Sequence, residues 1–334
     1  MNNQRKVLIA GAGGFIGGYM VGELLKQGQQ VRAVDIKPQW QWYQRFAGAE
    51  NLTLDLREKN SCYQAVNGYD WVYNFAADMG GMGFIELNKG LCMLSILINT
   101  HLLMAARDCG ADRFFYASSA CVYAGYKQKT TDNPGLKEED AYPADPEDGY
   151  GWEKLFSERM CRHFREDFGL ETRVARFHNV YGPHGTFDGG REKAPAALCR
   201  KVIHAKQTGA DFIEIWGDGL QTRSFTYIDD CIHGILAIMD SEIRTTINLG
   251  SSEMVSINQL LDIVEDIAGT RLKRTYNLNA PKGVRGRCSE NTLIKKLLDW
   301  EPSIPLRDGM AKTYVWIYEQ MKSGLSKDAV VNRY

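Results

Sequence analysis

A glycine-rich turn near the N-terminus constrains the fold of this chain more than any other feature. The segment Gly11-Ala12-Gly13-Gly14-Phe15-Ile16-Gly17 follows the apolar run Lys6–Gly11 and opens the helical pattern Phe15–Lys26. Its GxxGxxG spacing permits a tight turn and a close backbone approach to a pyrophosphate at the helix N-terminus. Isolated glycine clusters are often only structural turns, so the prediction depends on this position between a strand and a helix. The expected contacts are Gly11, Gly14, Phe15, Ile16 and Gly17.

The first half of the chain alternates apolar runs with helical patterns, as expected for strands and helices in turn. We expect helices over Phe15–Lys26, Asn88–Cys109 and Asp148–Phe168. The pattern predicts an α/β fold with a doubly wound parallel sheet of the Rossmann type, covered by helices on both faces. The expected strands are Lys6–Gly11, Gln30–Asp35, Leu52–Leu56, Trp71–Ala77, Arg113–Ser118 and Thr172–Phe177.

The regular alternation ends after Phe177. A glycine-rich stretch and a less periodic region follow, and strand-like and helical patterns return at Arg223–Asp240 and Thr246–Gly250. We therefore expect a dinucleotide-binding domain over 1–178 with a return segment at about 222–250. Residues 179–221 and 251–334 are expected to form a smaller C-terminal lobe that binds substrate.

Charge and composition give no reason to expect nucleic acid or a membrane as partner. The formal net charge is −1, so any cationic site must be local. The N-terminus lacks the pattern of a signal peptide, and the apolar segment Leu91–Ala106 is too short to span a bilayer, which favours a buried helix. The 8 cysteines form no CxxC pair, so neither a metal site nor a disulfide framework is expected. These features fit a cytoplasmic protein.

Acidic and small residues at the ends of later strands fit a dinucleotide. Asp35 ends the second predicted strand, where a carboxylate accepts hydrogen bonds from the adenosine ribose and repels a 2′-phosphate, which favours NAD over NADP. Asp55 either reaches the adenine or closes a turn. Ala76 and Ala77 either admit the cofactor or only pack tightly.

Tyr150 and Lys154 are spaced as one face of a helix requires, and Ser118-Ser119 ends the preceding strand. A lysine charge beside the phenol should lower the pKa of Tyr150 and make it a general base. An i,i+4 pair is often only a surface pair, but its position after the serines favours a proton-transfer unit of Ser119, Tyr150 and Lys154.

The order of these motifs resembles the extended short-chain dehydrogenases/reductases that act on nucleotide sugars. Dehydratases of that family usually follow the catalytic serine or threonine with Asp-Glu, whereas Ser119 is followed here by Ala120-Cys121. The acid for elimination is missing, so dehydration is disfavoured.

Longer segments resemble one group in that family, the GDP-mannose 3,5-epimerases, and the likeness extends from Gly11 to about Tyr318. Departures are local, at Ala124-Gly125 and His184. The segments that carry the likeness are Ala76–Phe84, Ser118–Cys121, Gly189–Pro195, Trp216–Phe225 and Gly283–Arg287.

The resemblance implies transient oxidation of the sugar at C4 by NAD, with Tyr150 as base and Ser119 holding the hydroxyl. Cys121 and Lys193 match the pair that removes and returns protons at C5 and C3, and a homodimer through two helices per subunit is common in the family. Taken singly, each residue also has a purely structural interpretation: Cys121 as a small buried hydrophobic residue, and Lys193 as a solvated loop residue. The implied substrate contacts are Gly80, Gly81, Ser119, Ala120, Cys121, Asn179, Glu192, Lys193, Ala194, Lys201, Gln221, Thr222, Arg223 and Arg287.

Two other functions stay open from the sequence. A nucleotide-sugar 4-epimerase would need Tyr150 and Ser119 but no Cys121–Lys193 pair. A non-catalytic, NAD-sensing member would typically lack the tyrosine or the lysine, and both are present here. The base of the nucleotide, guanine or another, rests on the resemblance alone.

Overall fold

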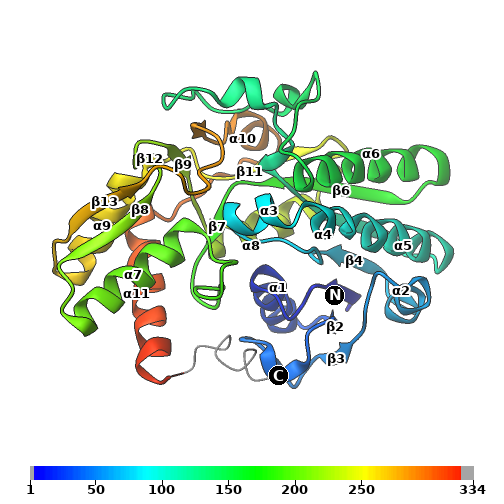
Figure 1. The fold of residues 1–334 in the computed structure, drawn as a ribbon. Coiled ribbons are helices and arrows are strands. Elements are labelled where there is room, and N and C mark those ends of the chain that lie inside the picture. The colour runs from blue at the N-terminus through cyan, green and yellow to red at the C-terminus, as the bar shows by residue number, and fades with distance from the viewer. Residues whose placement is uncertain (1–3, 325–334) are drawn as a thin grey trace.

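The computed structural model describes residues 4–324 and contains a parallel sheet of seven strands. Its strand order, β11-β6-β5-β4-β1-β2-β3, reverses direction at β1, as in a doubly wound sheet (Figure 1). The predicted fold class is therefore confirmed. The strands are β1 (Lys6–Ala10), β2 (Gln30–Asp35), β3 (Glu50–Thr53), β4 (Trp71–Asn74), β5 (Arg113–Ser119), β6 (Glu171–Phe177) and β11 (Ile247–Leu249).

Helices cover both faces of this sheet. On one face, α2 (Lys59–Val66), α5 (Ser95–Asp108) and α6 (Tyr150–Phe168) bury apolar side chains against alternate strand residues such as Leu8 and Phe114. On the other face, α1 (Phe15–Lys26) and α8 (Ile228–Asp240) pack against residues such as Ile9 and Phe115. The inner strands, such as β1 and β4, are thus buried on both sides, which explains their continuous apolar runs.

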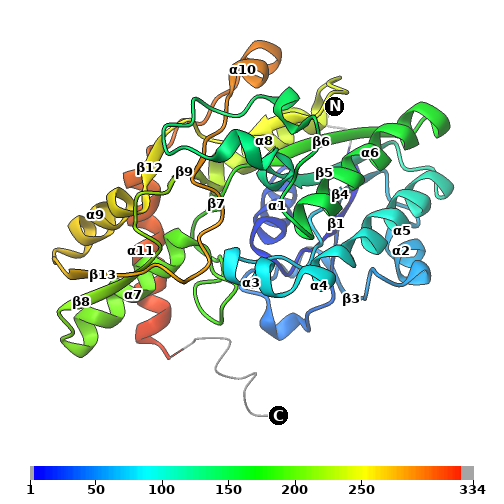
Figure 2. The same cartoon turned by 45° about the horizontal axis from the view of Figure 1, so that its top comes forward.

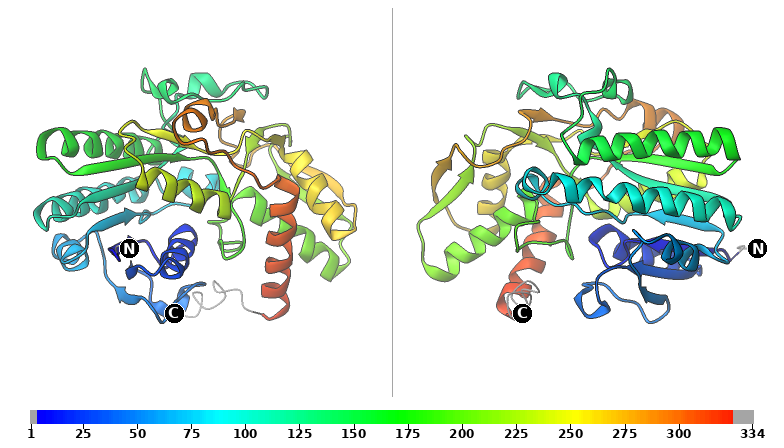
Figure 3. Two further views of the ribbon diagram at one scale, coloured as in Figure 1. Left: turned by 180° about the vertical axis from the view of Figure 1, so that it is seen from behind. Right: turned by 45° about the vertical axis from the view of Figure 1, so that its right-hand side comes forward.

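A second group of elements stands beside the sheet. The helices α7 (Ala194–Thr208), α9 (Ile257–Ala268) and α11 (Leu306–Lys322) pack together, and β8 (Phe212–Trp216) pairs with β13 (Lys273–Asn277). The three helices lie side by side in both views of Figure 3. Their apolar side chains continue the core that covers α1 and α8. The remaining elements are α3 (Met82–Leu87), α4 (Lys89–Met93), α10 (Thr292–Leu298), β7 (Val180–Tyr181), β9 (Thr222–Ser224), β10 (Thr226–Tyr227), β12 (Met254–Ser256), β14 (Gly286–Arg287) and the 3-10 turns η1 (Gln39–Gln41), η2 (Ala120–Val122), η3 (Gly125–Gln128) and η4 (Glu138–Ala141).

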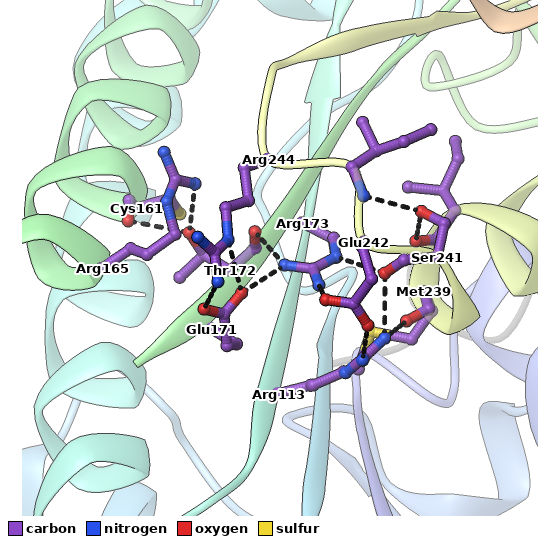
Figure 4. Close-up of polar contacts among 12 residues, drawn as sticks. Arg113, Cys161, Arg165, Glu171, Thr172, Arg173, Met239, Ser241, Glu242 and Arg244 are labelled. Atoms are coloured by element: carbon purple, nitrogen blue, oxygen red, sulfur yellow. Dashed lines mark hydrogen bonds and ion pairs between the residues drawn. The ribbon is translucent and has the colours of Figure 1, made fainter. Parts of the chain in front are cut away.

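A buried arginine fastens the chain at the point where it returns to the sheet. After α8 the chain joins the sheet as β11, which pairs with β6. The fully buried Arg173 on β6 donates from Nε to the Ser241 carbonyl at 2.9 Å and from Nη1 to Glu171 at 2.8 Å. Arg113 on β5 holds the same turn through Ser241 and Glu242 (Figure 4). The two buried or half-buried guanidinium groups thus donate hydrogen bonds to backbone carbonyls at this chain reversal.

Several predicted bounds differ by one or two residues, and three predicted elements differ by more. The third strand is Glu50–Thr53 rather than Leu52–Leu56, and the fourth ends at Asn74 rather than Ala77. The apolar residues that follow each strand lie in the loop at its carboxyl end. The predicted helix Asn88–Cys109 is interrupted at Leu94, where a short turn separates α4 from α5.

The segment Lys89–Asp108 is long and apolar enough to cross a membrane by length and composition alone. In the structure it packs against α2 and α6, and it buries Leu102, Leu103 and Ala106 in the core. The expectation of a buried helix is therefore right for one face. Leu94 and Leu97 on the other face are exposed.

Candidate active site

The glycine turn lies at the carboxyl end of β1 and leaves no room for side chains. Gly11 has a φ of +84°, and a Cβ there would lie 2.7 Å from the Ala76 nitrogen. A Cβ on Gly17 would lie 2.2 Å from the Gly11 carbonyl oxygen. Gly14 caps α1 without a side-chain hydrogen bond, so the first N–H groups of the helix remain for an anion. These residues fit a pyrophosphate as the sequence predicted.

The carboxylate of Asp35 is fixed beside this turn. It accepts hydrogen bonds from the Gly13 nitrogen at 3.0 Å and the Lys37 nitrogen at 2.9 Å. Burial raises its pKa, which these backbone donors oppose. Asp55 lies beyond β3 and pairs with Arg57 at 2.6 Å, so part of its hydrogen-bonding capacity is already used. Ala76 follows β4 and donates to the Asn74 side chain at 3.2 Å. The places of Asp35, Ala76 and the neighbouring Ala77 fit a dinucleotide along this edge.

Ser119, Tyr150 and Lys154 meet at the carboxyl end of β5. Tyr150 opens α6, and its side chain is buried within hydrogen-bonding reach of Ser119. The Lys154 Nζ lies 5.5 Å from the centre of the Tyr150 ring and donates to the Ala117 carbonyl at 3.2 Å. The structure thus brings the predicted proton-transfer unit together.

The expected lowering of the Tyr150 pKa is wrong for this structure. Burial raises the pKa of Tyr150 well above its ordinary value, and Cys121 and Glu153 raise it further, whereas the Ser119 hydrogen bond lowers it. The Lys154 ammonium also faces the Glu153 carboxylate at 3.7 Å. The negative charge of Glu153 therefore offsets part of the effect that the Lys154 charge has on the pKa of Tyr150.

Cys121 lies in the turn η2, directly after Ser119, and its thiol is buried. The Ser119 Oγ accepts from the Cys121 nitrogen at 3.2 Å and so joins the serine to the turn. The Arg287 Nη1 donates to the Cys121 Sγ at 3.5 Å. Burial and then the charge of Glu147 raise the pKa of Cys121, which Arg287 opposes, and the net value is about 11. The thiol is therefore protonated near neutral pH.

Lys193 ends the loop that precedes α7, and it lies within electrostatic reach of the Cys121 thiol. Its side chain is half-buried, and this burial lowers the pKa of the ammonium, which is thereby a stronger acid. The interpretation of Lys193 as a freely solvated loop residue is therefore wrong. Ala194 is the first residue of α7.

The loop before α7 packs directly on the segment after β4. The Gly81 nitrogen donates to the Arg191 carbonyl at 3.0 Å, and a Cβ on Gly81 would lie 2.4 Å from the Glu192 oxygen. Gly80 is also close to this loop, since a Cβ there would lie 3.1 Å from the Arg191 Cα. Figure 2 shows α3 beside this loop, between the sheet and the second group of helices. The glycines therefore allow the approach that holds Lys193 in place.

A further guanidinium group, that of Arg223, lies within electrostatic reach of the Cys121 thiol. Burial, and then the charge of Arg287, lower the pKa of Arg223 to about 10, while Glu147 and Cys121 raise it. Two arginines beside one glutamate leave an excess of positive charge, which suits an anionic substrate group. Gln221 is buried on the segment leading into β9, and the Thr222 hydroxyl donates to the Thr131 carbonyl at 2.5 Å.

The other predicted substrate residues, Asn179, Glu192 and Lys201, make hydrogen bonds to other parts of the chain. Asn179 has a φ of +42° and donates to the Ser224 carbonyl at 3.0 Å. The Glu192 carboxylate accepts from Arg200 at 3.0 Å. Lys201 donates to the Glu214 carbonyl at 2.8 Å, beside β8. No contact in the described residues links Lys201 to Cys121 or Arg287.

Sequence reasoning missed Glu147 and Gln128. The Arg287 Nη2 donates to Glu147 at 2.6 Å, and its Nε donates to the Gln128 Oε1 at 2.7 Å. Glu147 stands only three residues before Tyr150, and this proximity was a usable signal. Gln128 ends the 3-10 turn η3, whose sequence carries no motif, so only the fold reveals its contact with Arg287.

The family model for the NAD-dependent epimerase/dehydratase family matches residues 7–250. The chain therefore belongs to this family, and NAD is its cofactor. Among curated relatives, it is similar to GDP-mannose 3,5-epimerase 1 of rice (Oryza sativa subsp. japonica), at 49% identity over 95% of this chain and 82% of the relative. It is also similar to GDP-mannose 3,5-epimerase of Arabidopsis thaliana, at 47% identity over 98% of this chain and 86% of the relative.

Solved structures share the fold. A UDP-glucose 4-epimerase of Thermotoga maritima superposes with a TM-score of 0.85 at 22% identity, covering 95% of this chain and 99% of that one. The protein MoeE5, solved with UDP-glucose and NAD, gives a TM-score of 0.78 at 27% identity over 95% of this chain and 99% of that one.

Proposed function

We propose that this chain is a GDP-mannose 3,5-epimerase that converts GDP-D-mannose to GDP-L-galactose and GDP-L-gulose. The observation that carries the proposal is the meeting of Cys121 and Lys193 beside the unit of Ser119, Tyr150 and Lys154. Relatives of that name match nearly the whole chain at 47% identity or more. The arrangement of the site and the similarity to these relatives thus support the same function.

The reaction begins at C4 of the sugar. NAD held by the glycine turn and Asp35 would supply a hydride acceptor for C4 and would return the same hydride, so that no net oxidation would occur. Ser119 holds the C4 hydroxyl and Tyr150 receives its proton, while the Lys154 ammonium favours the phenolate. The resulting ketone acidifies the hydrogens on C3 and C5, because the carbanion is delocalised as an enolate.

Inversion then needs one group that removes a proton and another that returns it on the opposite face of the ring. Cys121 serves as the base and Lys193 as the acid, whose lowered pKa suits donation. Arg223 and Arg287 supply positive charge for the diphosphate and the enolate. Residues 179–221 and 251–334 form the substrate lobe in this proposal.

A 4-epimerase is the second candidate, because several neighbours in fold have that activity in their names. The Cys121→Ala variant separates the two. It should retain the transient nicotinamide absorbance of C4 oxidation but form no epimer at C5 or C3, as judged by chromatography of the recovered sugars. A 4-epimerase would keep its full activity. Loss of epimers would also exclude a non-catalytic, NAD-sensing protein, provided that the wild type forms them.

We also propose a homodimer and a cytoplasmic location. Met93, Leu94 and Leu97 are exposed on the α4–α5 segment, and Trp152 and Phe156 are exposed on the neighbouring α6. An apolar surface on two adjacent helices favours pairing with a second copy. A reducing compartment fits a mechanism that depends on a free thiol at Cys121.

A further inference from the structure

The carboxylate of Glu147 lies behind the reactive thiol without a full set of partners. Its Oε1 accepts from Arg287 at 2.6 Å, but its Oε2 is buried and has no hydrogen-bond partner in residues 4–324. A buried carboxylate oxygen without a donor is costly, and such groups in native structures usually have a functional reason. The side chain is 13% exposed and that of Arg287 is 5% exposed, so bulk water does not simply compensate.

Backbone contacts fix Glu147 against Cys121. The Glu147 nitrogen donates to the Cys121 carbonyl at 3.0 Å, and a Cβ on Gly151 would lie 2.4 Å from that same carbonyl oxygen. The segment before α6 is thus pressed onto the turn η2 that carries the thiol. Arg287 also links the two side chains, because its Nη1 donates to the Cys121 Sγ at 3.5 Å and its Nη2 donates to the Glu147 Oε1 at 2.6 Å.

We propose that Glu147 is the proton-accepting partner of Cys121 and makes the thiol a base near neutral pH. This inference rests on the proposed function and deepens it. As the proton leaves C5 for the Cys121 sulfur, the original S–H proton moves to Glu147. The sulfur remains a neutral thiol, the carboxylate becomes a carboxylic acid, and the sugar becomes an enolate, so charge and protons balance. Lys193 then protonates the enolate on the opposite face and becomes neutral.

The surrounding charges support this direction of transfer. Cys121 from η2, Arg287 from β14, Arg223 from β9 and Lys193 from the start of α7 all face the carboxylate or the thiol. Arg287 keeps the Glu147 pKa below its ordinary value in spite of burial, so Glu147 is ionised at rest. Cys121 is protonated at rest. The thiol therefore needs an acceptor, and Glu147 is the ionised carboxylate that shares Arg287 with it.

The test compares wild type with Glu147→Gln, which keeps the size and an oxygen acceptor for Arg287. Exchange of the C5 hydrogen with D2O is measured with GDP-mannose from pH 6 to pH 9. At neutral pH the variant should exchange about 100-fold more slowly, with KM little changed. Its deficit relative to wild type should shrink about tenfold per pH unit as the thiol ionises by itself. A constant deficit at every pH, or no deficit, would overturn the inference.

Controls separate this role from a merely structural one. Glu171→Gln makes the same change at a glutamate–arginine pair far from the site, and it should leave exchange unaltered. C4 oxidation by Glu147→Gln shows that the variant is folded. If it does not fold, Glu147→Asp takes its place and should show slower exchange with the pH profile of the wild type. A profile like that of a free thiol in the Asp variant would contradict the inference.

A substrate-free measurement distinguishes failure of this inference from failure of the proposed function. The Cys121 thiolate is titrated by ultraviolet absorbance as the difference between each protein and its Cys121→Ala counterpart. Glu147→Gln should lower the thiol pKa, because it removes a neighbouring negative charge. An unchanged thiol pKa would overturn the inference even if the wild type did not act on GDP-mannose.

Discussion

Burial acts in opposite directions on the two proton carriers, Cys121 and Lys193. It raises the pKa of the thiol to about 11 and lowers the pKa of the ammonium, because it disfavours the charged form of each group. The lysine thereby becomes the better acid of the two at neutral pH. The thiol becomes the weaker acid and requires a neighbour to accept its proton.

Lys193→Met should retain C4 oxidation and lose epimer formation by about 10²–10⁴-fold, because the returning proton has no donor. Cys121 still removes the C5 proton, so some deuterium should enter the recovered manno sugar in D2O. NMR of that sugar and chromatography of the products check both effects. Lys206→Met, on the same helix α7, is the control and should behave as wild type. Normal epimer yield from Lys193→Met would refute its role.

The buried side chain of His178 should make the folded state less stable at acid pH. His178 pairs through Nε2 with the Asn248 Oδ1 at 3.1 Å, and its Nδ1 has no partner in the described chain. Burial lowers its pKa to about 3, below the ordinary 6.5. The unfolded chain thus binds the proton first, and stability is lost as the pH falls from about 6.5 toward 3, by up to about 1.4 kcal/mol per pH unit.

His178→Gln should reduce this acid dependence relative to wild type. The free energy of unfolding is measured by denaturant at pH 7 and pH 5 for both proteins. The difference between the two pH values should be smaller in the variant, even if its stability at pH 7 is lower. An equal difference in both proteins would show that His178 is not the group responsible.

The motifs at the site were predictable and their electrostatics were not. Ser119, Cys121 and Tyr150 stand in recognisable segments, and the structure gathers them as expected. The raised pKa of Tyr150 depends on burial and on Glu153, neither of which a spacing reveals. Glu147 and Gln128 act through Arg287, which is distant in sequence and meets them only in the folded chain.

At the scale of elements, regular patterns predicted the first half of the chain well. The helix Phe15–Lys26 and the strand Gln30–Asp35 were predicted with their correct bounds, because clear turn residues flank them. The helices α7, α9 and α11 were missed. For α9 the signal was present, since Ser256 and Gln259 form a capping box and apolar residues follow at helical spacing. Strand ends were less certain because apolar loop residues continue the same pattern.

The hydrogen bonds that Arg173 makes to the chain between α8 and β11 should contribute to the stability of the fold. Arg173→Ala should lower the free energy of unfolding by about 3 kcal/mol or more, because it opens a cavity and removes one of the two guanidinium donors of the Ser241 carbonyl. Glu242→Gln should cost at most about 1 kcal/mol, because that side chain is 76% exposed. Denaturant unfolding checks both values. Equal losses in the two variants would contradict this account of the network.

For the whole molecule, the site requires both groups of elements. The parallel sheet supplies the glycine turn, Ser119 and Cys121, while Lys193 comes from the start of α7 and Arg287 from β14. Oxidation at C4 therefore depends on residues at the edge of the sheet, whereas inversion at C5 also requires Lys193 and Arg287 from outside it. This division explains how one fold supports several reactions on nucleotide sugars.

The proposed dimer is testable at the same scale. Phe156→Glu places a charge within the apolar surface of α6 and should raise the dissociation constant of the dimer by about 30-fold or more. Sedimentation velocity over a range of concentrations measures this shift. Phe212→Glu, on β8, changes an equally exposed aromatic residue elsewhere and should leave the dimer intact. A dimer unaffected by Phe156→Glu would place the interface on another surface.

The most direct test of the central claim is incubation of the purified protein with GDP-mannose in D2O, followed by NMR of the recovered sugars. We expect deuterium at C3 and C5 and the appearance of the galacto and gulo epimers, without accumulation of reduced cofactor. Unchanged mannose, with hydrogen retained at both carbons, would contradict the proposed reaction.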